Sequence, residues 1–281
     1  MPTPSFEGRR VLALESRRAT EIAALIRNLD GDPVVAPALR EVPFDSNPDA
    51  LAFAAALERN EFDLVVFLTG VGIRALLRVV EQAQRRDAFV AALGRTKIAA
   101  RGPKPLAVLR ELAVPVWVTA PEPNTWRELL AAIDAESSSV PLASARVAVQ
   151  EYGVSNPELL KGLHERGAVV TQVPVYQWAL PDDIEPLQQA VTAITSGALD
   201  VVILTSGVQL AHLWQIAEQM RAEDALKRGL ASMVIASIGP TCSEEIERRG
   251  LHPDLQASHP KMGLLVREAA EQSADLLRAK R

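Results

Sequence analysis

The sequence predicts an α/β protein made of two similar domains, and three observations support this prediction. Long segments of the chain recur at one offset, and short apolar runs alternate with amphipathic segments. Glycines and prolines also stand where helices are expected to end and to begin. With 281 residues, of which 48% are hydrophobic, the chain is long enough to form two hydrophobic cores.

The recurrence is clearest in the segment "DLVVFLTGVGIRALLRVVEQ", which starts at Asp63 and returns 137 residues later as "DVVILTSGVQLAHLWQIAEQ" at Asp200. Segments that begin at Arg10 and Arg146 are 136 residues apart, so one gap falls between Gly31 and the next anchor. Repeats of this length exceed solenoid units of about 20 to 50 residues, and they predict two domains. Two further pairs have the longer offset, namely Pro37 with Pro174 and Gly102 with Gly239.

The elements of the first copy are expected in the order strand, helix, strand, repeated along the chain. The strands are "RVLAL", "PVVAPAL", "FDLVVFLT", "KIAA" and "VPVWVT", each followed by an amphipathic segment, which is typical of parallel sheets covered on both faces. Helix ends are expected at Gly31, Gly167 and Gly250. Helix starts are expected at Pro103 and Pro240, and at two capping boxes, Thr125 with Glu128 and Thr241 with Glu244.

Composition excludes several classes of protein. A net charge of −5 with few aromatic residues does not suit a nucleic-acid surface, so no nucleic-acid partner is expected. Cys242 is the single cysteine and cannot form an internal disulfide. The N-terminus has no apolar signal core, and no apolar run reaches about 18 residues, so no membrane association is expected. We expect a cytoplasmic protein that acts as a monomer.

Four loops are the candidate ligand-binding segments because they follow predicted strands and lead into predicted helices. Their glycines let a ligand approach the backbone, and the N–H groups of the following helix starts attract carboxylates or phosphates. Alternatively, these glycines only make tight turns. Their equivalent placement in both domains favours an anion held between two facing domains. The loops are Thr69–Gly72, Ala100–Lys104, Thr205–Gly207 and Ser237–Cys242.

Other chemical signals are weak. The sequence contains no Gly-x-Ser-x-Gly, no P-loop and no dinucleotide-binding fingerprint. We interpret Cys242 as a packing or capping residue and not as a nucleophile. The histidines are scattered without metal-ligand spacing, so no metal and no cofactor are expected. They are His164, His212, His252 and His259.

Tyr176 is the one candidate catalytic side chain. It lies in "VVTQVPVYQW", an extended segment that aligns with "PVVAPALREV" in the first copy, and both segments resemble connectors between domains. A tyrosine there would face the space between the domains and could donate a proton from its phenol. The alternative is a tyrosine that packs with its hydroxyl in water.

Five segments of the sequence together resemble the uroporphyrinogen-III synthase family, from about Val11 to Val266. They are "LTGVGIRAL", "ARGPKPLAVLREL", "VPVYQW", "LTSGVQL" and "IGPTCSEEIERRGLHP". The resemblance implies two flavodoxin-like α/β lobes, joined by a two-stranded connector, with a cofactor-free site between them. Lobe one would comprise residues 1–37 and 176–281, lobe two residues 41–172, and the connectors about 35–42 and 171–178.

The resemblance also implies an activity. The family cyclises linear hydroxymethylbilane to uroporphyrinogen III, with loss of water and inversion of the last pyrrole ring, through an azafulvene and a spiro intermediate. Tyr176 matches the tyrosine that assists departure of the hydroxyl. The implied substrate-binding residues are Thr69, Gly70, Val71, Gly72, Arg101, Gly102, Lys104, Thr205, Ser206, Gly207, Gly239, Thr241 and Cys242.

Two departures from the family pattern leave other functions open. Cys242 replaces the second threonine of a Gly-Pro-Thr-Thr sequence, and Gly70 and Val71 stand where many members have serine and a small or polar residue. A non-catalytic regulatory protein of the same fold could bind a tetrapyrrole or another anion. A two-lobed solute-binding protein is a further alternative, for which an export signal would be expected.

Overall fold

The computed structural model describes residues 4–43, 47–139, 141–153 and 155–280, without the side chains of Glu41, Pro43, Tyr152, Tyr176 and Gln177. The chain divides into two compact units. Unit 1 comprises Met1–Arg40 and Ala179–Arg281, and unit 2 comprises Glu41–Trp178.

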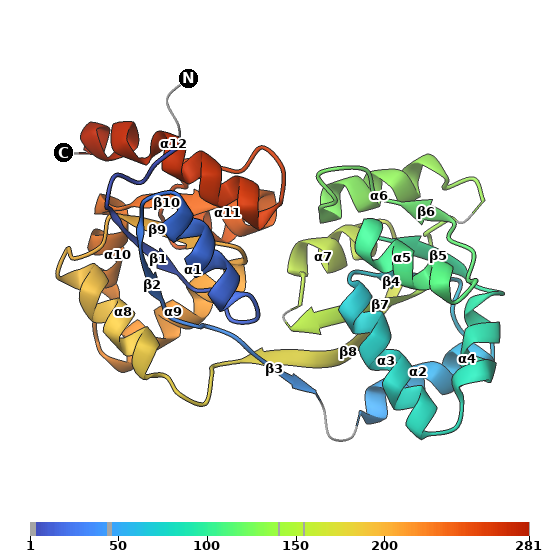
Figure 1. Cartoon of the computed structure of the whole chain (residues 1–281). Coiled ribbons are helices and arrows are strands. Elements are labelled where there is room, and N and C mark those ends of the chain that lie inside the picture. Colours follow the sequence, from blue (N-terminus) through green and yellow to red (C-terminus); the bar gives the residue numbers. More distant parts are fainter. Residues whose placement is uncertain (1–3, 44–46, 140, 154, 281) are drawn as a thin grey trace. The chain divides into compact units, whose positions relative to one another are not determined.

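Unit 1 contains a five-stranded sheet in the order β11-β10-β9-β1-β2, so the blue strand β1 lies beside β9 from far along the chain (Figure 1). Every neighbouring pair in this sheet is parallel. The strands are β1 (Arg10–Ala13), β2 (Asp32–Val35), β9 (Val201–Leu204), β10 (Val234–Ser237) and β11 (Leu255–Gln256).

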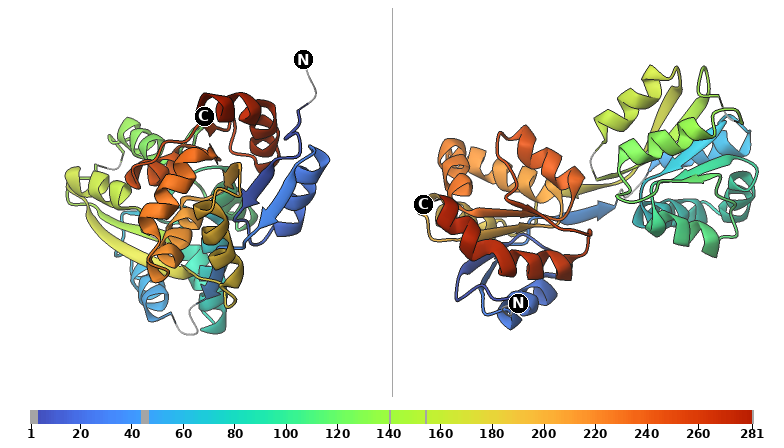
Figure 2. Two further views of the ribbon diagram at one scale, coloured as in Figure 1. Left: turned by 90° about the vertical axis from the view of Figure 1, so that its left-hand side faces the viewer. Right: turned by 90° about the horizontal axis from the view of Figure 1, so that it is seen from above.

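Helices cover both faces of this sheet (Figure 2). Alternate residues of a strand point to opposite faces, so Val11 and Ala13 pack with one helical layer while Leu12 and Leu14 pack with the other. The first layer contains α1 (Ala19–Asn28) and α12 (Met262–Lys280). The second contains α8 (Glu185–Thr195), α9 (Gly207–Gln219), α10 (Glu223–Ser232) and α11 (Pro240–Arg248).

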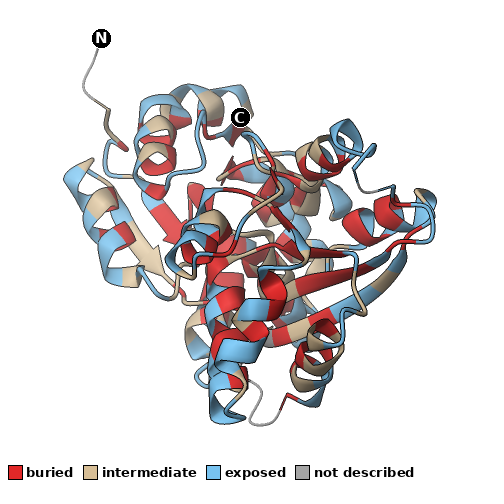
Figure 3. Cartoon of the chain, turned by 90° about the vertical axis from the view of Figure 1, so that its right-hand side faces the viewer, coloured by how far each residue is buried: buried red, intermediate tan, exposed pale blue. Residues whose placement is uncertain are grey.

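Unit 2 contains a sheet in the order β3-β8-β7-β4-β5-β6. Its strands are β3 (Arg40–Pro43), β4 (Leu64–Phe67), β5 (Lys97–Ala100), β6 (Val118–Thr119), β7 (Arg146–Gly153) and β8 (Val169–Ala179). One face is covered by α2 (Pro48–Glu58), α3 (Gly70–Gln82), α4 (Arg86–Leu93) and α5 (Pro103–Glu111), the other by α6 (Trp126–Ala135) and α7 (Pro157–Glu165). In Figure 3 the helices are buried on one side and exposed on the other, as two-sided packing requires.

The two sheets have the same strand order once the repeat is taken into account. Strands β2-β1-β9-β10-β11 of unit 1 have the flavodoxin-like order 2-1-3-4-5 along the chain, and the repeat matches them to β8-β7-β4-β5-β6 of unit 2, whose sheet has β3 as an additional edge strand. The predicted α/β class with two similar lobes is therefore confirmed. In this arrangement the strand order reverses between β1 and β9, and between β7 and β4, and ligands bind near such switch points.

The repeated aspartates anchor the start of corresponding strands. Asp63 Oδ2 accepts the Arg146 backbone N–H at 2.8 Å, and Asp200 Oδ2 accepts the Arg10 N–H at 3.0 Å. Asp63 also forms an ion pair with the Arg146 side chain, which holds the pKa of this carboxyl below its usual value. The offset between Asp63 and Asp200 in the sequence therefore corresponds to an equivalent aspartate-to-backbone hydrogen bond in each unit.

The observed helix starts agree with those predicted from the sequence, except at one capping box. The box of Thr125 and Glu128 is present, and Pro103 and Pro240 begin α5 and α11. The box predicted for Thr241 and Glu244 is wrong, because Pro240 takes the first helical position and makes Gly239 the N-cap.

The helix ends agree except at Gly31. Gly167 and Gly250 follow α7 and α11 with φ of 83° and 67°. After α1 the left-handed residue is Asp30, with φ of 57°, and not the predicted glycine. Gly31 comes one position later, where a Cβ atom would lie 2.7 Å from Ile26 Cγ2, so close approach explains this glycine.

Candidate functional site

In each unit two helices begin side by side beyond the carboxyl ends of the central strands. Unit 2 has α3 after β4 and α5 after β5, and unit 1 has α9 after β9 and α11 after β10. The helices of each pair pack against each other. The first N–H groups of a helix have no intrahelical acceptor and lie at the positive end of its dipole, so each pair of N-termini can bind anionic groups.

Two caps hold the first helix of each pair. Thr69 caps α3, because its side chain accepts the Gly72 N–H at 3.0 Å. Ser206 caps α9 at the equivalent position and forms a capping box with Gln209. These caps use N–H groups further into the helix, so the N–H groups of the first helical residues, Gly70 and Gly207, are directed toward the loop.

Most glycines of the loops contact protein atoms closely. A Cβ atom on Gly70 would lie 2.8 Å from Lys104 O, and one on Gly207 would lie 2.8 Å from Glu245 Cβ. These two glycines therefore let the paired helices begin side by side. Gly72 similarly faces the Gln150 side chain, and Gly102 faces Asn124.

Gly239 differs from the other glycines of the loops. The nearest atom to an added Cβ would be Pro260 Cβ, at 3.9 Å, which is ordinary van der Waals contact. Its φ of 165° is extended backbone that any residue adopts. A Cβ atom would therefore fit at this buried N-cap without displacing protein atoms.

Substitution by alanine should distinguish Gly70, which allows two helices to approach closely, from Gly239, which does not have this packing role. We expect Gly70→Ala to destabilise the protein by about 1 to 3 kcal/mol, because the new methyl group overlaps a backbone oxygen of α5. Gly239→Ala should unfold close to the wild-type midpoint, because the new methyl group would make only an ordinary contact with Pro260. Urea unfolding of both variants tests the expectation, and a Gly70→Ala protein as stable as wild type would contradict it.

A buried glutamine organises the switch point of unit 1. Gln209 is 1% exposed, and its Oε1 accepts the N–H groups of Thr205 and Ser206 at 2.9 and 3.2 Å. Its Nε2 donates to Thr205 Oγ1 at 2.8 Å, and Thr205 Oγ1 donates to Glu15 Oε2 at 2.6 Å. The loop between β9 and α9 is thus linked through its side chains to the end of β1.

A second glutamine occupies the switch point of unit 2 but comes from a different element. Gln150, on β7, is also 1% exposed, and its Oε1 accepts the Thr69 N–H at 3.4 Å. Its Nε2 lies where a Cβ atom on Gly72 would be, at 2.1 Å, so the glycine makes room for the amide. Thr69 and Ser206 are equivalent in the repeat, so each unit holds the same backbone N–H with a glutamine.

The sequence-based site omitted Glu15, Gln150 and Gln209. One signal could have identified Gln209, because Ser206 and Gln209 fit the spacing of a capping box. Glu15 and Gln150 gain their roles from partners 190 and 81 residues away in the chain. Such partners follow from the topology of the sheets and are not visible in local patterns.

The predicted cations and the exposed loop residues lie beside the helix N-termini. Arg101 is partly buried, and its backbone N–H donates to Phe67 O at 3.0 Å, which joins the ends of β5 and β4. Lys104 is exposed in the first turn of α5, and Thr241 is exposed at the equivalent position of α11. Val71 is exposed at the start of α3. Unit 2 therefore has a cation where unit 1 has a hydroxyl.

Cys242 is buried beneath the N-terminus of α11. Its side chain is 3% exposed, and Sγ donates a weak hydrogen bond to Leu204 O at 3.8 Å. Burial raises the pKa of the Cys242 thiol to about 11, so the thiol stays protonated at neutral pH. Any contact of this residue with a ligand would therefore have to come from its backbone.

Tyr176 lies in β8, but its side chain is outside the described residues. The backbone around it is irregular. Glu151 pairs with Pro174 and Gly153 with Gln177, so β8 has one more residue than β7 between these pairs. Bulges of this kind occur often beside active sites because they redirect a side chain. The role of the Tyr176 phenol remains a prediction.

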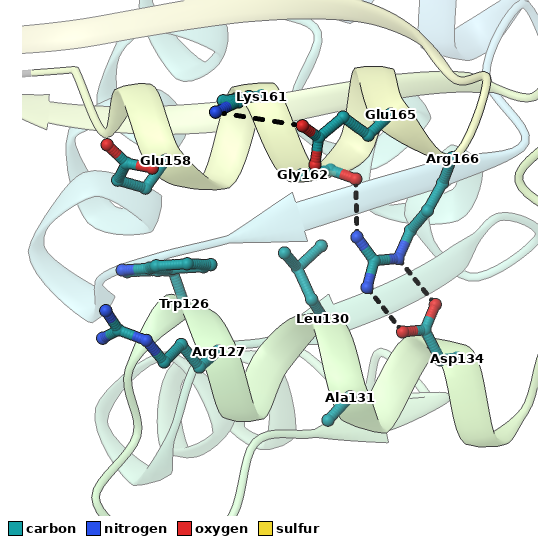
Figure 4. A pocket seen from close by; sticks show the side chains of 10 residues that line it. All are labelled: Trp126, Arg127, Leu130, Ala131, Asp134, Glu158, Lys161, Gly162, Glu165 and Arg166. Carbon is teal, nitrogen blue, oxygen red and sulfur yellow. Dashed lines mark hydrogen bonds and ion pairs between the residues drawn. The ribbon is translucent and has the colours of Figure 1, made fainter.

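A pocket of unit 2 lies away from the predicted residues, between α6 and α7 (Figure 4). Arg166 bridges the helices by donating to Asp134 and to Gly162 O, and Lys161 pairs with Glu165 at 3.9 Å. Arg127 stacks over the Trp126 ring, with Cζ 4.4 Å from its centroid. The charged groups of this pocket are thus largely paired among themselves.

Neither a metal-binding cluster nor a membrane-spanning helix is found in the part of the chain that the structure describes. Within it, no group of three or more histidine, cysteine, aspartate or glutamate side chains could hold a metal ion. No helix in the same described ranges has the length and apolar character needed to cross a bilayer.

Comparison with known proteins identifies relatives over most of the chain. A Bacillus subtilis (strain 168) protein named "Uncharacterized protein YjjA" is 27% identical over 268 residues, which cover 94% of this chain and 96% of that protein. A Methanothermobacter thermautotrophicus protein named "Putative uroporphyrinogen-III synthase" is 27% identical over 241 residues, covering 83% and 87% of the two chains.

Solved structures have the same fold. A mutant uroporphyrinogen III synthase from the extremely thermophilic bacterium Thermus thermophilus matches with a TM-score of 0.75 at 22% identity, covering 95% of this chain and 99% of that one. A wild-type crystal form of the Thermus synthase matches with a TM-score of 0.58 at 24% identity, covering 95% and 98%. At these identities the likeness shows the fold alone.

The match of the sequence to a family model identifies the family of this chain. The family model described as "Uroporphyrinogen-III synthase HemD" matches residues 20–267, which is most of the chain. This match agrees with the five segments on which the resemblance rested. The chain therefore belongs to the uroporphyrinogen-III synthase family.

Proposed function

We propose that this protein is a uroporphyrinogen-III synthase, a lyase that cyclises linear hydroxymethylbilane to uroporphyrinogen III with loss of water and inversion of ring D. The observation that carries the proposal is the pair of helix N-termini at the carboxyl edge of each sheet. A linear tetrapyrrole with acetate and propionate side chains needs many separate sites for carboxylates, and helix N-termini provide them. Membership in the family supports the same reaction.

The main task of such an enzyme is orientation. Without an enzyme the linear substrate closes to the symmetric isomer I, so the protein must hold the last ring in the inverted position. Backbone N–H groups of α3, α5, α9 and α11 bind the carboxylates, and Lys104 adds a positive charge beside α5. Tyr176 donates a proton or a hydrogen bond to the departing hydroxyl. The reaction requires no metal or organic cofactor and takes place in the cytoplasm, with the protein as a monomer.

The test is to supply hydroxymethylbilane to the purified protein after dialysis against a chelator. We expect isomer III to predominate, as measured by chromatographic separation of the oxidised products. A folded protein that leaves only isomer I would overturn the proposal. Binding of uroporphyrin in that case, measured by fluorescence quenching, would favour the alternative of a non-catalytic tetrapyrrole- or anion-binding regulatory protein.

A further inference from the structure

Glu15 lies at the switch point of unit 1, next to the candidate ligand loops. Ala13 of β1 pairs in register with Ile203 of β9, and Glu15 and Thr205 are each two residues beyond that pair. Both residues therefore leave the sheet at its carboxyl edge, between the strands where the strand order reverses. Open α/β sheets bind ligands at this position.

The hydrogen bonds around Glu15 have a defined direction. Backbone N–H groups only donate, so the Gln209 oxygen must face Thr205 N and Ser206 N, and its Nε2 must face Thr205 Oγ1. The Nε2 group also only donates, so the Thr205 hydroxyl directs its own hydrogen to Glu15 Oε2, 2.6 Å away. A buried amide thus holds the Thr205 hydroxyl, and the hydroxyl in turn donates to the carboxyl group of Glu15.

A carboxylate at this position is unexpected for a site that attracts anions. The helix N-termini nearby favour negative ligands, whereas Glu15 would repel the acetate and propionate groups of a tetrapyrrole. A carboxylate accepts hydrogen bonds and stabilises positive charge. Glu15 is partly buried, and its Oε1 accepts one long hydrogen bond, 3.4 Å, from the Arg18 N–H. Its chemistry suits the pyrrole N–H groups of the substrate.

We propose that Glu15 accepts a hydrogen bond from the N–H of the pyrrole ring that loses its hydroxyl, and stabilises the positive charge that forms there. The inference rests on the proposed function. In this step the C–O bond breaks and its electron pair leaves with the oxygen, which takes a proton from a general acid and departs as water. The nitrogen lone pair forms a C=N bond in the ring, and the ring π electrons shift to form the exocyclic C=C bond, so the nitrogen, still bearing its hydrogen, becomes positive opposite the carboxylate.

Gln209 and Thr205 are then positioning residues for Glu15. Substitution of Thr205 by valine keeps the shape of the side chain but removes the hydrogen that Glu15 accepts. The carboxylate could then rotate away from the ring. We expect turnover of Thr205→Val to fall about tenfold, less than on loss of the charge itself, because only the orientation is weakened.

The experiment compares three variants by kcat and KM for formation of isomer III. Glu15→Gln keeps the size of the side chain and an oxygen for Thr205 but removes the negative charge. We expect its kcat to fall about 10²-fold with KM nearly unchanged, because the charge acts on the transition state. Glu218→Gln, an exposed position near the far end of α9, removes the same charge and should match wild type. Thermal midpoints of all variants check folding.

The outcomes separate this inference from the proposed function. A wild-type protein that forms no isomer III overturns both. An active wild type with an equally active Glu15→Gln variant overturns the inference alone, as does a rise in KM without a change in kcat. If Glu15→Gln does not fold, the turnover of Thr205→Val tests the inference instead. Wild-type turnover in that variant overturns the inference.

Discussion

Replacement of Tyr176 by phenylalanine is expected to lower the rate of isomer III formation by about 10²- to 10⁴-fold, which is the usual contribution of a positioned general acid. The hydroxyl group of hydroxymethylbilane leaves more easily when a donor supplies a proton to its oxygen. The family resemblance predicts this role for Tyr176, and the backbone of β8 is irregular beside it. The substitution deletes one oxygen and keeps the ring, so the packing of the strand should survive. The measurements are kcat and the ratio of isomers III and I.

Cys242→Ser is the matched comparison, because it also changes a residue that the family pattern places in the site. The Cys242 thiol is buried and protonated, and we assign it no chemistry. Turnover should stay close to wild type, although a buried hydroxyl lowers the free energy of unfolding by about 1 kcal/mol. Near-wild-type rates for Tyr176→Phe would remove the phenol from the mechanism. A folded but inactive serine variant would instead give the cysteine a role.

Residues 41–178 expressed alone should unfold in one cooperative transition. Strands β4 to β7, all but the last residue of β8, and the helices α2 to α7 lie within this segment. The end at Trp178 is chosen because Val173 and Val175 of β8 belong to the core that packs on α2 to α5. A segment with a complete core is able to fold as a domain. Urea unfolding followed by circular dichroism gives the measurement.

Residues 1–140 are the contrasting fragment. It ends where the first domain would end if the two copies were arranged in tandem. They contain β1 and β2 without β9, and β4 without β7, so two central strands lose a neighbour. Exposed strand edges of this kind favour aggregation. We expect no cooperative transition from this fragment. A stable, well-dispersed 1–140 fragment beside an unfolded 41–178 fragment would favour the tandem arrangement.

The sequence predicted the fold because the signals for it are local and occur twice. Apolar runs and helix-initiating prolines each depend only on neighbouring residues. The errors arose where two local signals compete. At α11 the capping-box spacing of Thr241 and Glu244 competes with Pro240, and the proline decides where the helix begins. After α1, Asp30 takes the left-handed conformation that was expected of Gly31.

The candidate site was less predictable, because its geometry depends on residues far apart in the chain. The sequence identified the loop glycines, but it did not show which atoms these glycines approach. Gly70 and Gly207 closely approach neighbouring helices, whereas a Cβ atom on Gly239 would make only an ordinary contact with Pro260. Glu15 and Gln150 are positioned by hydrogen bonds that only the folded sheets bring about. Periodicity identifies buried faces, but it does not identify the partner of a buried amide.

The strand order of unit 1 also determines when this unit can form during synthesis. Strand β1 leaves the ribosome early, but its neighbour β9 is translated almost 190 residues later. At bacterial or eukaryotic elongation rates this interval lasts roughly 10 to 40 seconds. Over that time the apolar residues Val11 and Leu12 of the nascent chain lack their central partner, and the whole of unit 2 is translated before β9. We therefore expect the N-terminal segment to be the part of the emerging chain that chaperones bind.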